Sequence, residues 1–454
     1  MIRSLTFSRW FALVVLILLG FAGLLLGTAG GRGVPAGPGP LAPSGGAAGG
    51  GNSEAAAPAP VVGPNGIALG WDAQHDLSPP LRSLPPIPPA SGRREAEAEN
   101  PPIPLVGHRD TPDAVVQRSL QPSPSLDGPA PSMPAPATNW DGIASQGAGG
   151  GGCNCAPPDT NGEVGPNHYI QMVNSSLQIW NKSGTSLYGP ASISTIWQGT
   201  TGLCATTNRG DPVVLYDQLA DRWVISQFAF NTNIIGNPTG PFSECIAVSS
   251  TADPLGTWNR YAFQLSTSDF PDYPHFGVWP DGYYMSVNWF ANAATYAGPR
   301  PYVFNRTAML NGTAASFQTT SGPLGSAVSP NLPSDLDGPT PPPAGAPNVF
   351  VGFGSSMPVY KFHVDWANSA NTTWTQSATL SPAGFTQLCG ATRDCLPQPG
   401  TTQKLDGIGD RLMYRLAYRN FGDHEALAVT HNVNAGGGLA GLRWYEIRNP
   451  AGTP

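Results

Sequence analysis

A phrase that recurs five times along the chain constrains the fold more than any other feature. In each copy, an Asp beside a Pro or Gly is followed by a short apolar strand, a turn and a second strand rich in aromatic residues. An interval of about 50 to 70 residues between copies accommodates one four-stranded antiparallel sheet, so the repeat predicts a ring of such sheets. The copies are marked by Asp159, Asp211, Asp272, Asp337 and Asp406.

Alternation of apolar and polar residues predicts strands inside the copies. Residues 168–187 predict two strands around a turn at 181–184, residues 213–230 predict a hairpin with its tip at 217–221, and residues 276–290 predict a hairpin around 280–282. No stretch has helical periodicity. We therefore expect an all-β fold, a β-propeller over residues 140–454. The five repeats are consistent with a complete five-bladed ring and with an incomplete larger propeller.

The first 139 residues have a different composition from the rest. Residues 1–30 place Arg3 and Arg9 ahead of an uncharged apolar run at 10–27, which predicts an export signal. The run is about 18 residues long, the lower limit for a spanning helix, so a cleaved signal peptide and a retained N-terminal membrane anchor both fit. Residues 31–139 are rich in Pro, Ala and Gly and predict a disordered stalk, because such a composition buries little apolar surface.

Charge and cysteine content indicate where the protein acts. Only 11% of residues are charged, the net charge is −7 and the longest basic run is Arg93-Arg94, which disfavours nucleic-acid binding. Membrane contact is expected only through the N-terminal segment. Six cysteines beyond residue 150 predict a secreted or extracytoplasmic protein with disulfides. The preferred pairs are Cys204 with Cys245 and Cys389 with Cys395. For Cys153 and Cys155 a mutual bond, other partners and free thiols stay open.

Several phrases resemble a group of large exported bacterial proteins that are predicted to be β-propellers. They include "CNCAPPDTNGEVGPNHYIQMVN" at 153–174, "DYPHFGVWPDGYYMSVN" at 272–288 and "RLMYRLAYRNFGDHEALAVTHNV" at 411–433. The resemblance covers roughly residues 140–448. It implies export and a propeller fold, and it implies no particular activity.

The phrase "STADPLGTWNRYAF" at 250–263 is similar to the blade phrase of five-bladed glycosidases of the arabinanase and xylosidase type. This weaker resemblance implies that the five marker aspartates open inner strands and face a central pocket. The chain departs from that family because no Glu stands in the Glu-Gly-Pro setting of the family's general acid.

Glycoside hydrolysis needs two carboxyl groups, one protonated and one ionised, on opposite sides of the scissile bond. Asp211 and Asp159 are candidate bases or nucleophiles, and Asp272 is the candidate that tunes the pair. The candidate acids are Glu425, Glu244 and Glu163. An Asp before Pro or Gly also caps a turn without any catalytic role, so the sequence leaves the question of an enzyme open.

Ligand and metal candidates come from the same phrases. A calcium ion held in the channel by Asp159, Asp211 and Asp272 fits because calcium tolerates irregular oxygen ligands. The function we expect first is a binding module for an extracellular polysaccharide or protein, with a glycosidase-like hydrolase as the alternative. The candidate ligand-binding residues are Asp159, Asp337, Asp406, His168, His275, Trp197 and Trp289.

Overall fold

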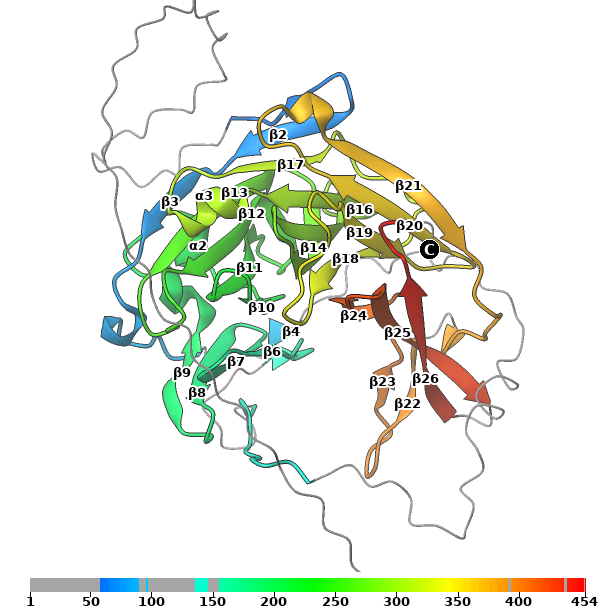
Figure 1. Ribbon diagram of the computed structural model, residues 1–454. Coiled ribbons are helices and arrows are strands. Elements are labelled where there is room, and N and C mark those ends of the chain that lie inside the picture. The colour runs from blue at the N-terminus through cyan, green and yellow to red at the C-terminus, as the bar shows by residue number, and fades with distance from the viewer. Residues whose placement is uncertain are drawn as a thin grey trace, which may run out of the picture. The chain divides into compact units, whose positions relative to one another are not determined.

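Five antiparallel blades form the body of the computed structural model, and the last two are joined into one sheet by a parallel strand pair (Figure 1). The structure describes residues 58–89, 95–96, 135–145, 155–390, 393–436, 439–452 and 454. The sheets follow one another along the chain as propeller blades, which confirms the predicted all-β propeller. The α-helices within these ranges are α2 (Leu203–Thr206) and α3 (Arg306–Leu310), and both are short.

The first two blades follow the predicted strand pattern, with the turn at 181–184 and the hairpin tip at 217–221 in place. Each blade starts with its inner strand and works outward by antiparallel pairing. Blade 1 consists of β6 (Asn161–Val164), β7 (His168–Val173), β8 (Ser176–Asn181) and β9 (Ser186–Ser192), and is followed by the 3-10 helix η3 (Ile193–Trp197). Blade 2 consists of β10 (Val213–Asp217), β11 (Arg222–Thr232), β12 (Pro238–Ser249) and β13 (Trp258–Ser266).

Blades 3, 4 and 5 repeat this order, but the described part of blade 5 has three strands. Blade 3 consists of β14 (Phe270–Val278), β15 (Tyr283–Ala291), β16 (Thr295–Phe304) and β17 (Ser316–Thr320). Blade 4 consists of β18 (Asn331–Leu336), β19 (Asn348–Gly352), β20 (Met357–His363) and β21 (Thr373–Leu380), with the 3-10 helix η4 (Ser369–Asn371) before β21. Blade 5 consists of β24 (Met413–Asn420), β25 (Glu425–Gly436) and β26 (Leu439–Arg448). The hairpin β22 (Asp394–Pro397) and β23 (Lys404–Asp406) precedes it.

Apolar cores between successive blades hold the sheets face to face. One core joins blades 1 and 2, a second joins blades 2 and 3, and a third joins blade 3 to blades 4 and 5. Trp223, Trp258 and Trp279 are each at most 1% exposed in these cores. Burial of a large apolar side chain contributes about 1.5–3 kcal/mol, so the aromatic residues of the repeated phrases stabilise the blade interfaces.

The predicted disordered stalk over 31–139 does not hold for residues 58–89. Here β1 (Val61–Val62) pairs with β2 (Ile67–Trp71), β2 pairs with β17 at the edge of blade 3, and β3 (Gln74–Leu77) pairs with β13 at the edge of blade 2. In Figure 1 the blue β2 and β3 lie along these green strands. The physical reason is the open backbone edge of an outer strand, which a short segment covers by hydrogen bonding even in a proline-rich region.

The 3-10 helix η1 (Leu81–Ser83) and the extended residues after it continue this N-terminal segment onto blade 1, where Ser192 N donates to Ile87 O at 2.8 Å. The segment thus contacts blades 3, 2 and 1 in that order. The two-residue strands β4 (Glu95–Ala96) and β5 (Cys155–Ala156) form a separate parallel pair. The expected signal peptide or anchor at 1–30 lies outside the described residues, and so do residues 31–57, 90–94 and 97–134 of the expected stalk.

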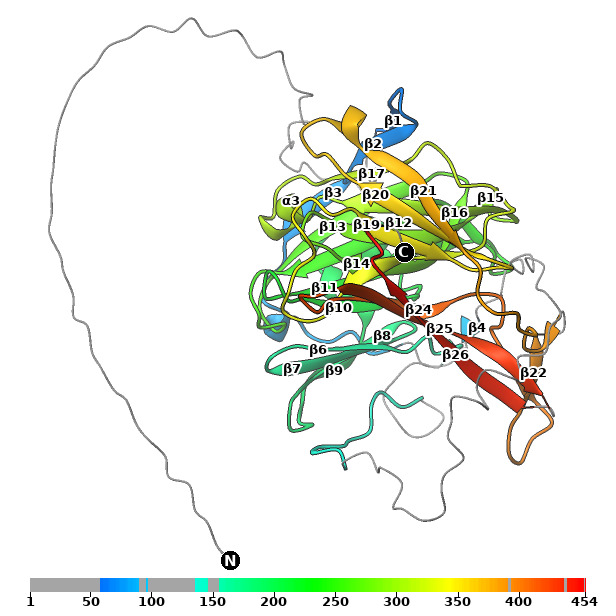
Figure 2. The ribbon, with the colours of Figure 1, turned by 45° about the vertical axis from the view of Figure 1, so that its right-hand side comes forward.

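Two of the five marker aspartates stand elsewhere than predicted. Asp337 follows the inner strand of blade 4 instead of opening it, and Asp406 ends β23 ahead of blade 5. The inner strands of blades 4 and 5 pair in parallel, with Ser334 opposite Leu416. In the turned view of Figure 2, blade 1 and blade 5 are again separate sheets. The described strands therefore form no continuous closed sheet around the ring.

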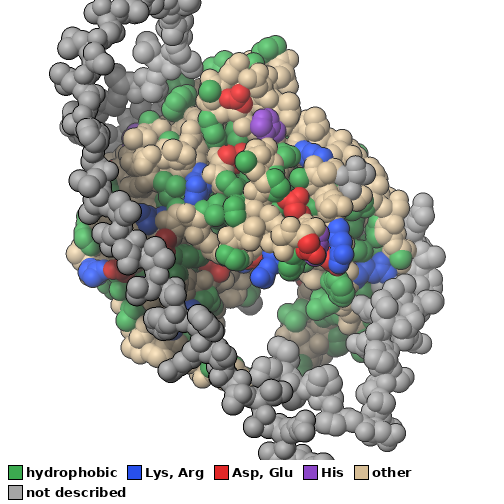
Figure 3. Space-filling view, in the orientation of Figure 1, with side chains coloured by type: hydrophobic (Ala, Val, Ile, Leu, Met, Phe, Trp, Pro, Cys, Tyr) green, Lys and Arg blue, Asp and Glu red, His purple; other side chains and the backbone are tan. Residues whose placement is uncertain are grey.

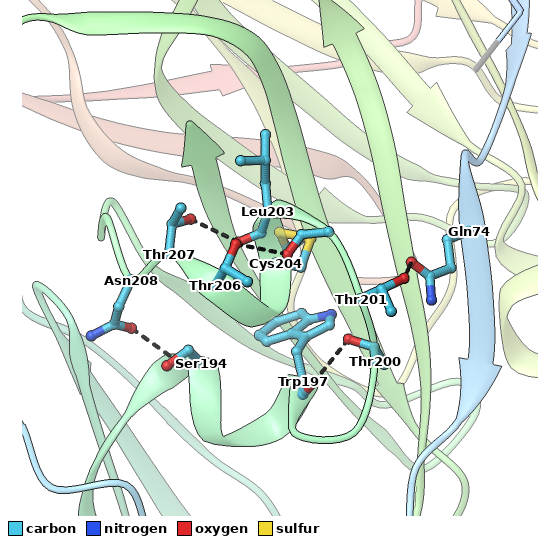
Figure 4. The surroundings of a disulfide bond; sticks show 12 residues. Gln74, Ser194, Trp197, Thr200, Thr201, Leu203, Cys204, Thr206, Thr207 and Asn208 are labelled. Carbon is cyan, nitrogen blue, oxygen red and sulfur yellow. Dashed lines mark hydrogen bonds between the residues drawn. A yellow bond between two sulfur atoms is a disulfide. The ribbon is translucent and has the colours of Figure 1, made fainter. Parts of the chain in front are cut away.

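Both predicted disulfides are present. Cys204 on α2 is bonded to Cys245 on β12, which fastens the connection after blade 1 onto blade 2. Figure 4 shows the indole of Trp197 beside this bond. Cys389 and Cys395 close a short loop before blade 5. Cys155 is also disulfide-bonded. None of the helices in the described ranges has the length and apolar character that crossing a bilayer requires.

Candidate functional site

The segments that open the inner strands of blades 1 and 2 meet at one end of the ring. Asn174 Nδ2 donates to Asp159 Oδ2 at 2.8 Å, and Asn174 Oδ1 accepts from Asp211 N at 2.8 Å. Asp159 and Asp211 both have positive φ angles, 38° and 43°. Such a backbone costs of order 1–3 kcal/mol in a residue other than Gly, so surrounding contacts must hold it in place. Asn174 is the side chain that connects the two.

Blade 3 joins this cluster through Tyr273, which also has a positive φ of 55°. Tyr273 N donates to Asp211 Oδ2 at 3.2 Å, so the carboxylate connects two blades instead of capping its own turn. Burial raises the pKa of Tyr273 to about 12, and the negative charges of Asp159 and Asp211 act in the same direction. The structure thus brings two predicted site residues together and adds Asn174 and Tyr273, which the sequence did not single out.

Blade 5 supplies the positive charge at this end. The guanidinium of Arg411 lies over the ring of Tyr273 at 5.0 Å and binds both carboxylate oxygens of Asp410, at 2.8 and 3.0 Å. Asp272 on β14, which lies opposite Asn288 on β15, adds its negative charge to the field at Arg411. Segments of blades 1, 2 and 3 and the segment that precedes β24 of blade 5 therefore meet in one polar network.

His275 closes the network on the side of blade 4. Its Nδ1 lies 2.9 Å from the carbonyl oxygen of Tyr273, and burial lowers the pKa of the ring to about 4, so the imidazole is neutral at pH 7. A cavity of about 10 Å³ lies beside it, the space of one water molecule and too small for a sugar ring. The cavity is lined by Tyr273, His275, Ser286, Asn288, Pro330, Asn331, Leu332, Arg411 and Leu412.

A second cluster lies where the inner strands of blades 1, 4 and 5 approach one another. Arg415 on β24 binds Glu163 on β6 at 3.1 Å and Asp337 at 2.6 Å, and its Nε lies 2.7 Å from Asp335 Oδ2. Asp335 also accepts from Val278 N of blade 3 at 2.7 Å. One guanidinium therefore holds three carboxyl groups within a few ångström of one another.

These carboxyl groups differ in their burial, which raises the pKa of two of them. Burial raises the pKa of Asp335 to about 7, although Arg415 opposes the shift, and burial also raises the pKa of Glu163. Asp335 is almost fully buried, whereas Asp337 is about one-third exposed. The sequence missed Asp335 because only its contact with Arg415, 80 positions along the chain, distinguishes it. An arginine inside the apolar strand "MYRLAY" was the available signal.

Most of the other predicted site residues lie apart from these clusters, but Asp406 is linked to the first one through Arg393 and Asp410. Glu425 opens β25, where it accepts a hydrogen bond from Tyr418, and His168 opens β7 in a partly buried position that lowers its pKa. Asp406 is bound by Arg393 Nε at 2.9 Å, and Arg393 also reaches Asp410 at 3.2 Å. Glu244, the remaining acid candidate, is fully buried in β12, and its pKa is raised well above the ordinary value.

Trp197 and Trp289, two of the candidate ligand-binding residues, are buried, so neither presents its indole to a ligand in solvent. Trp197 is 2% exposed and Trp289 is 4% exposed, and Trp289 carries the guanidinium of Arg300 on its face at 4.6 Å. Residue type alone does not reveal whether a tryptophan in a propeller points to solvent or to the next blade. In this chain both Trp197 and Trp289 lie in interfaces between blades.

The described residues contain no group of three His, Cys, Asp or Glu side chains that is arranged to hold a metal ion. Asp159 and Asp211 direct carboxylate oxygens at Asn174 and at the backbone of Tyr273. The calcium ion expected at Asp159, Asp211 and Asp272 therefore stays a prediction.

An open groove lies on the rim of blade 1. Its volume is about 490 Å³, within the usual range for a small-molecule site. One wall is residues 82–86 of the N-terminal segment and the other is residues 186–189 of β9. Leu187 is 39% exposed on the strand wall, and Arg82, which pairs with Asp253, stands on the other. On the face seen in Figure 3, basic and acidic side chains are interspersed.

The chain matches no protein-family model and no curated protein. Among solved structures it is similar to a GH43 endo-arabinanase from Bacillus licheniformis, with 9% identity and a TM-score of 0.29 over 63% of this chain and 92% of that one. A GH43 β-1,3-galactosidase with galactodeoxynojirimycin gives 8% identity and a TM-score of 0.31 over 63% and 89%. An α-L-arabinanase of Cellvibrio cellulosa complexed with arabinohexaose gives 9% identity and a TM-score of 0.26 over 63% and 90%.

Proposed function

We propose that this protein is an exported β-propeller that binds an extracellular polymer, a glycan or a polypeptide, at the rim of blade 1 without catalysis. The observation that carries the proposal is the groove of about 490 Å³ between residues 82–86 and 186–189. Its exposed walls combine apolar surface from Leu187 and Pro85 with the polar side chains of Arg82 and Ser186. Such a combination suits an extended ligand that lies across the surface.

The centre of the ring supports a structural role for the inner carboxylates. Asp159 and Asp211 are engaged by Asn174 and Tyr273, and the cavity beside them has room for one water. Asp410 is held by Arg411 in a bidentate pair. A catalytic pair needs open space between its two carboxyl groups for the scissile bond, and the cavity of about 10 Å³ beside Tyr273 does not provide it.

The test is retention of the full chain on insoluble arabinan, xylan and gelatin, with and without Leu187→Asp. Placing a charge on the groove wall is expected to abolish retention on the matrix that binds the wild type. Leu219→Asp is the matched control, because Leu219 is 38% exposed in the turn between β10 and β11 and lies away from the groove. Retention that Leu187→Asp leaves unchanged would overturn the assignment of the groove.

A glycoside hydrolase is the second candidate, and the cluster around Arg415 favours it. Asp335, with a pKa of about 7, and Glu163 come from different blades and lie on the same guanidinium. Glycosidases use two neighbouring carboxyl groups, one of them with a raised pKa, and burial raises the pKa of both Asp335 and Glu163. In this alternative, Asp335→Asn and Glu163→Gln would each abolish the release of reducing ends from arabinohexaose.

A further inference from the structure

The N-terminal segment on the rim of blade 1 is held through its carbonyl groups. Tyr188 OH donates to Leu84 O at 2.9 Å, and Gln198 Nε2 donates to Pro85 O at 2.7 Å. Ser192 donates twice, from its backbone N to Ile87 O at 2.8 Å and from Oγ to Pro88 O at 3.1 Å. Four of five consecutive carbonyls, from residue 84 to residue 88, are therefore bound by this one blade.

The donor set matches the chemistry of a proline-rich strand. Proline has no N–H, so residues 85–89 offer one backbone donor, Ile87 N, and Thr195 Oγ1 accepts it at 3.2 Å. Proline also fixes its own φ and moves the preceding residue towards extended conformations, so the segment is pre-ordered as a polyproline-type strand. Domains that recognise such strands use grooves lined with aromatic side chains. Blade 1 presents Tyr188, and Ser192 and Gln198 add donors to the carbonyls of the strand.

The binding groups lie beneath the segment. Thr195 is fully buried, Ser192 is 5% exposed and Tyr188 is 9% exposed, whereas Ile87 is 37% exposed. The segment therefore covers the groups that bind it and keeps its own outer side in solvent, as a ligand bound on a surface does.

The bound sequence occurs a second time in the chain. Residues 85–88 read Pro-Pro-Ile-Pro, and residues 101–104 read Pro-Pro-Ile-Pro again. The second copy lies outside the described residues. The chain therefore carries two copies of the motif, and a site that recognises the carbonyl pattern of one suits the sequence of the other.

We propose that the surface formed by β9, η3 and Gln198 is a recognition site for proline-rich polypeptides that carry Pro-Pro-Ile-Pro, filled here by the chain's own residues 85–88. The inference rests on the proposed binding function of this rim and specifies a polypeptide as its partner. The partner takes the place of residues 85–88 on β9, so it replaces the groove wall to which Pro85 and Pro86 contribute. The chain's own segment is tethered by β3, which ends at Leu77, so its effective concentration is of order millimolar. A partner in trans binds when this segment is displaced.

The experiment uses the full chain and a labelled peptide, Ser-Leu-Pro-Pro-Ile-Pro-Pro-Ala, with fluorescence anisotropy as the readout. In the loosened variant, Pro85→Gly, Pro86→Gly and Pro88→Gly weaken the tethered segment by raising its ordering cost. We expect this variant to bind the peptide at least about ten times more tightly than the wild type does. Adding Tyr188→Phe and Gln198→Ala removes two donors and is expected to weaken peptide binding about tenfold. Tyr169→Phe, on β7 of the same blade, is the matched control and is expected to have no effect.

The second peptide in the assay has every Pro replaced by Gly. The inference is overturned if a loosened variant with an unchanged circular dichroism spectrum binds both peptides equally. If the loosened variant does not fold, trypsin cleavage after Arg82 decides the question. Tyr188→Phe with Gln198→Ala is then expected to accelerate this cleavage about tenfold, since local release exposes the bond, and an unchanged rate overturns the inference. If the protein is retained on arabinan or xylan but does not bind the peptide, this inference fails and the proposed function stands. If the protein neither is retained on a glycan nor binds the peptide, the proposed function fails as well.

Discussion

The guanidinium of Arg415 in blade 5 binds the carboxylate of Glu163 in blade 1 at 3.1 Å, across the place where the two ends of the propeller domain meet. The same guanidinium contacts Asp335 and Asp337 from blade 4. Within the described strands, the first and last blades share no sheet. An ion-pair network therefore connects the first and last blades at this position, as a shared strand connects them in a propeller ring that is closed by hydrogen bonding.

Arg415→Ala is expected to lower the free energy of unfolding by about 3 kcal/mol, because it leaves partly buried carboxylates without their cation. Urea unfolding followed by tryptophan fluorescence measures the change. Arg448→Ala is the control, since Arg448 is 63% exposed and pairs with Glu446 at the surface, where such pairs contribute less than about 1 kcal/mol. Equal effects of the two substitutions would show that Arg415 does not hold the blades together.

Asp335 gives a pH dependence of known sign. Its folded-state pKa of about 7 lies above that of the unfolded chain, so the folded protein holds more protons between about pH 4 and pH 7. Its contribution to stability is present below this window and is lost as the pH rises through it. Wild type is therefore expected to lose stability relative to Asp335→Asn, by at most about 1.4 kcal/mol per pH unit.

The stability of the wild type must be compared with that of Asp335→Asn because the titration of His275 changes the stability in the opposite direction. Burial lowers its pKa to about 4, so its contribution increases as the pH rises from about 4 to 6.5. Urea unfolding at pH 4.5, 5.5, 6.5 and 7.5 measures both chains. Parallel stability curves for wild type and Asp335→Asn would contradict the raised pKa.

The N-terminal strands are expected to be part of the stable fold. A Cβ atom added to Gly70 on β2 would lie 2.4 Å from the ring of Phe317 on β17, so Gly70→Ala is expected to cost about 1–3 kcal/mol. Gly322→Ala is the matched control, since nothing lies within 4 Å of its added Cβ. Differential scanning calorimetry of the two variants measures the difference, and equal melting temperatures would mean that β2 does not pack on blade 3.

The two disulfides are expected to differ in what they contribute. Cys204 and Cys245 are separated by 41 residues, and Cys389 and Cys395 by 6. Cross-linking removes more conformational freedom from the unfolded chain when the closed loop is longer, so replacing the first pair by Ala is expected to cost about 1.5 kcal/mol more than replacing the second. Denaturant unfolding of the two double variants gives the comparison. A larger loss for the short loop would contradict this account.

The repeated phrases predicted the blades because the signals for a strand and a turn are local. The turn at 181–184 and the hairpin tip at 217–221 needed only their own residues, and so did the preference of Cys204 for Cys245 on either side of one repeat. Asp159 and Asp211 were predicted to open inner strands from the same local phrases, and each lies two residues before such a strand.

The rest depended on contacts between distant parts of the chain. The five residues of β2 form a strand only because β17 offers an open edge, and nothing in residues 67–71 indicates that partner. Asp335 becomes distinctive only beside Arg415, and Trp197 is buried only because η3 lies against blade 2. Local patterns predict elements, whereas the packing of one blade on the next decides which side chains are exposed.

Binding without catalysis is tested by incubating the full chain with arabinohexaose, arabinan and xylan. Reducing ends and bound protein are measured in the same samples. We expect that no reducing ends are released and that Leu187→Asp abolishes retention of the protein on any polysaccharide that retains the wild type. Release of reducing ends that disappears in Glu163→Gln, while Leu187→Asp retains it, would contradict the account and make the cluster around Arg415 the active site.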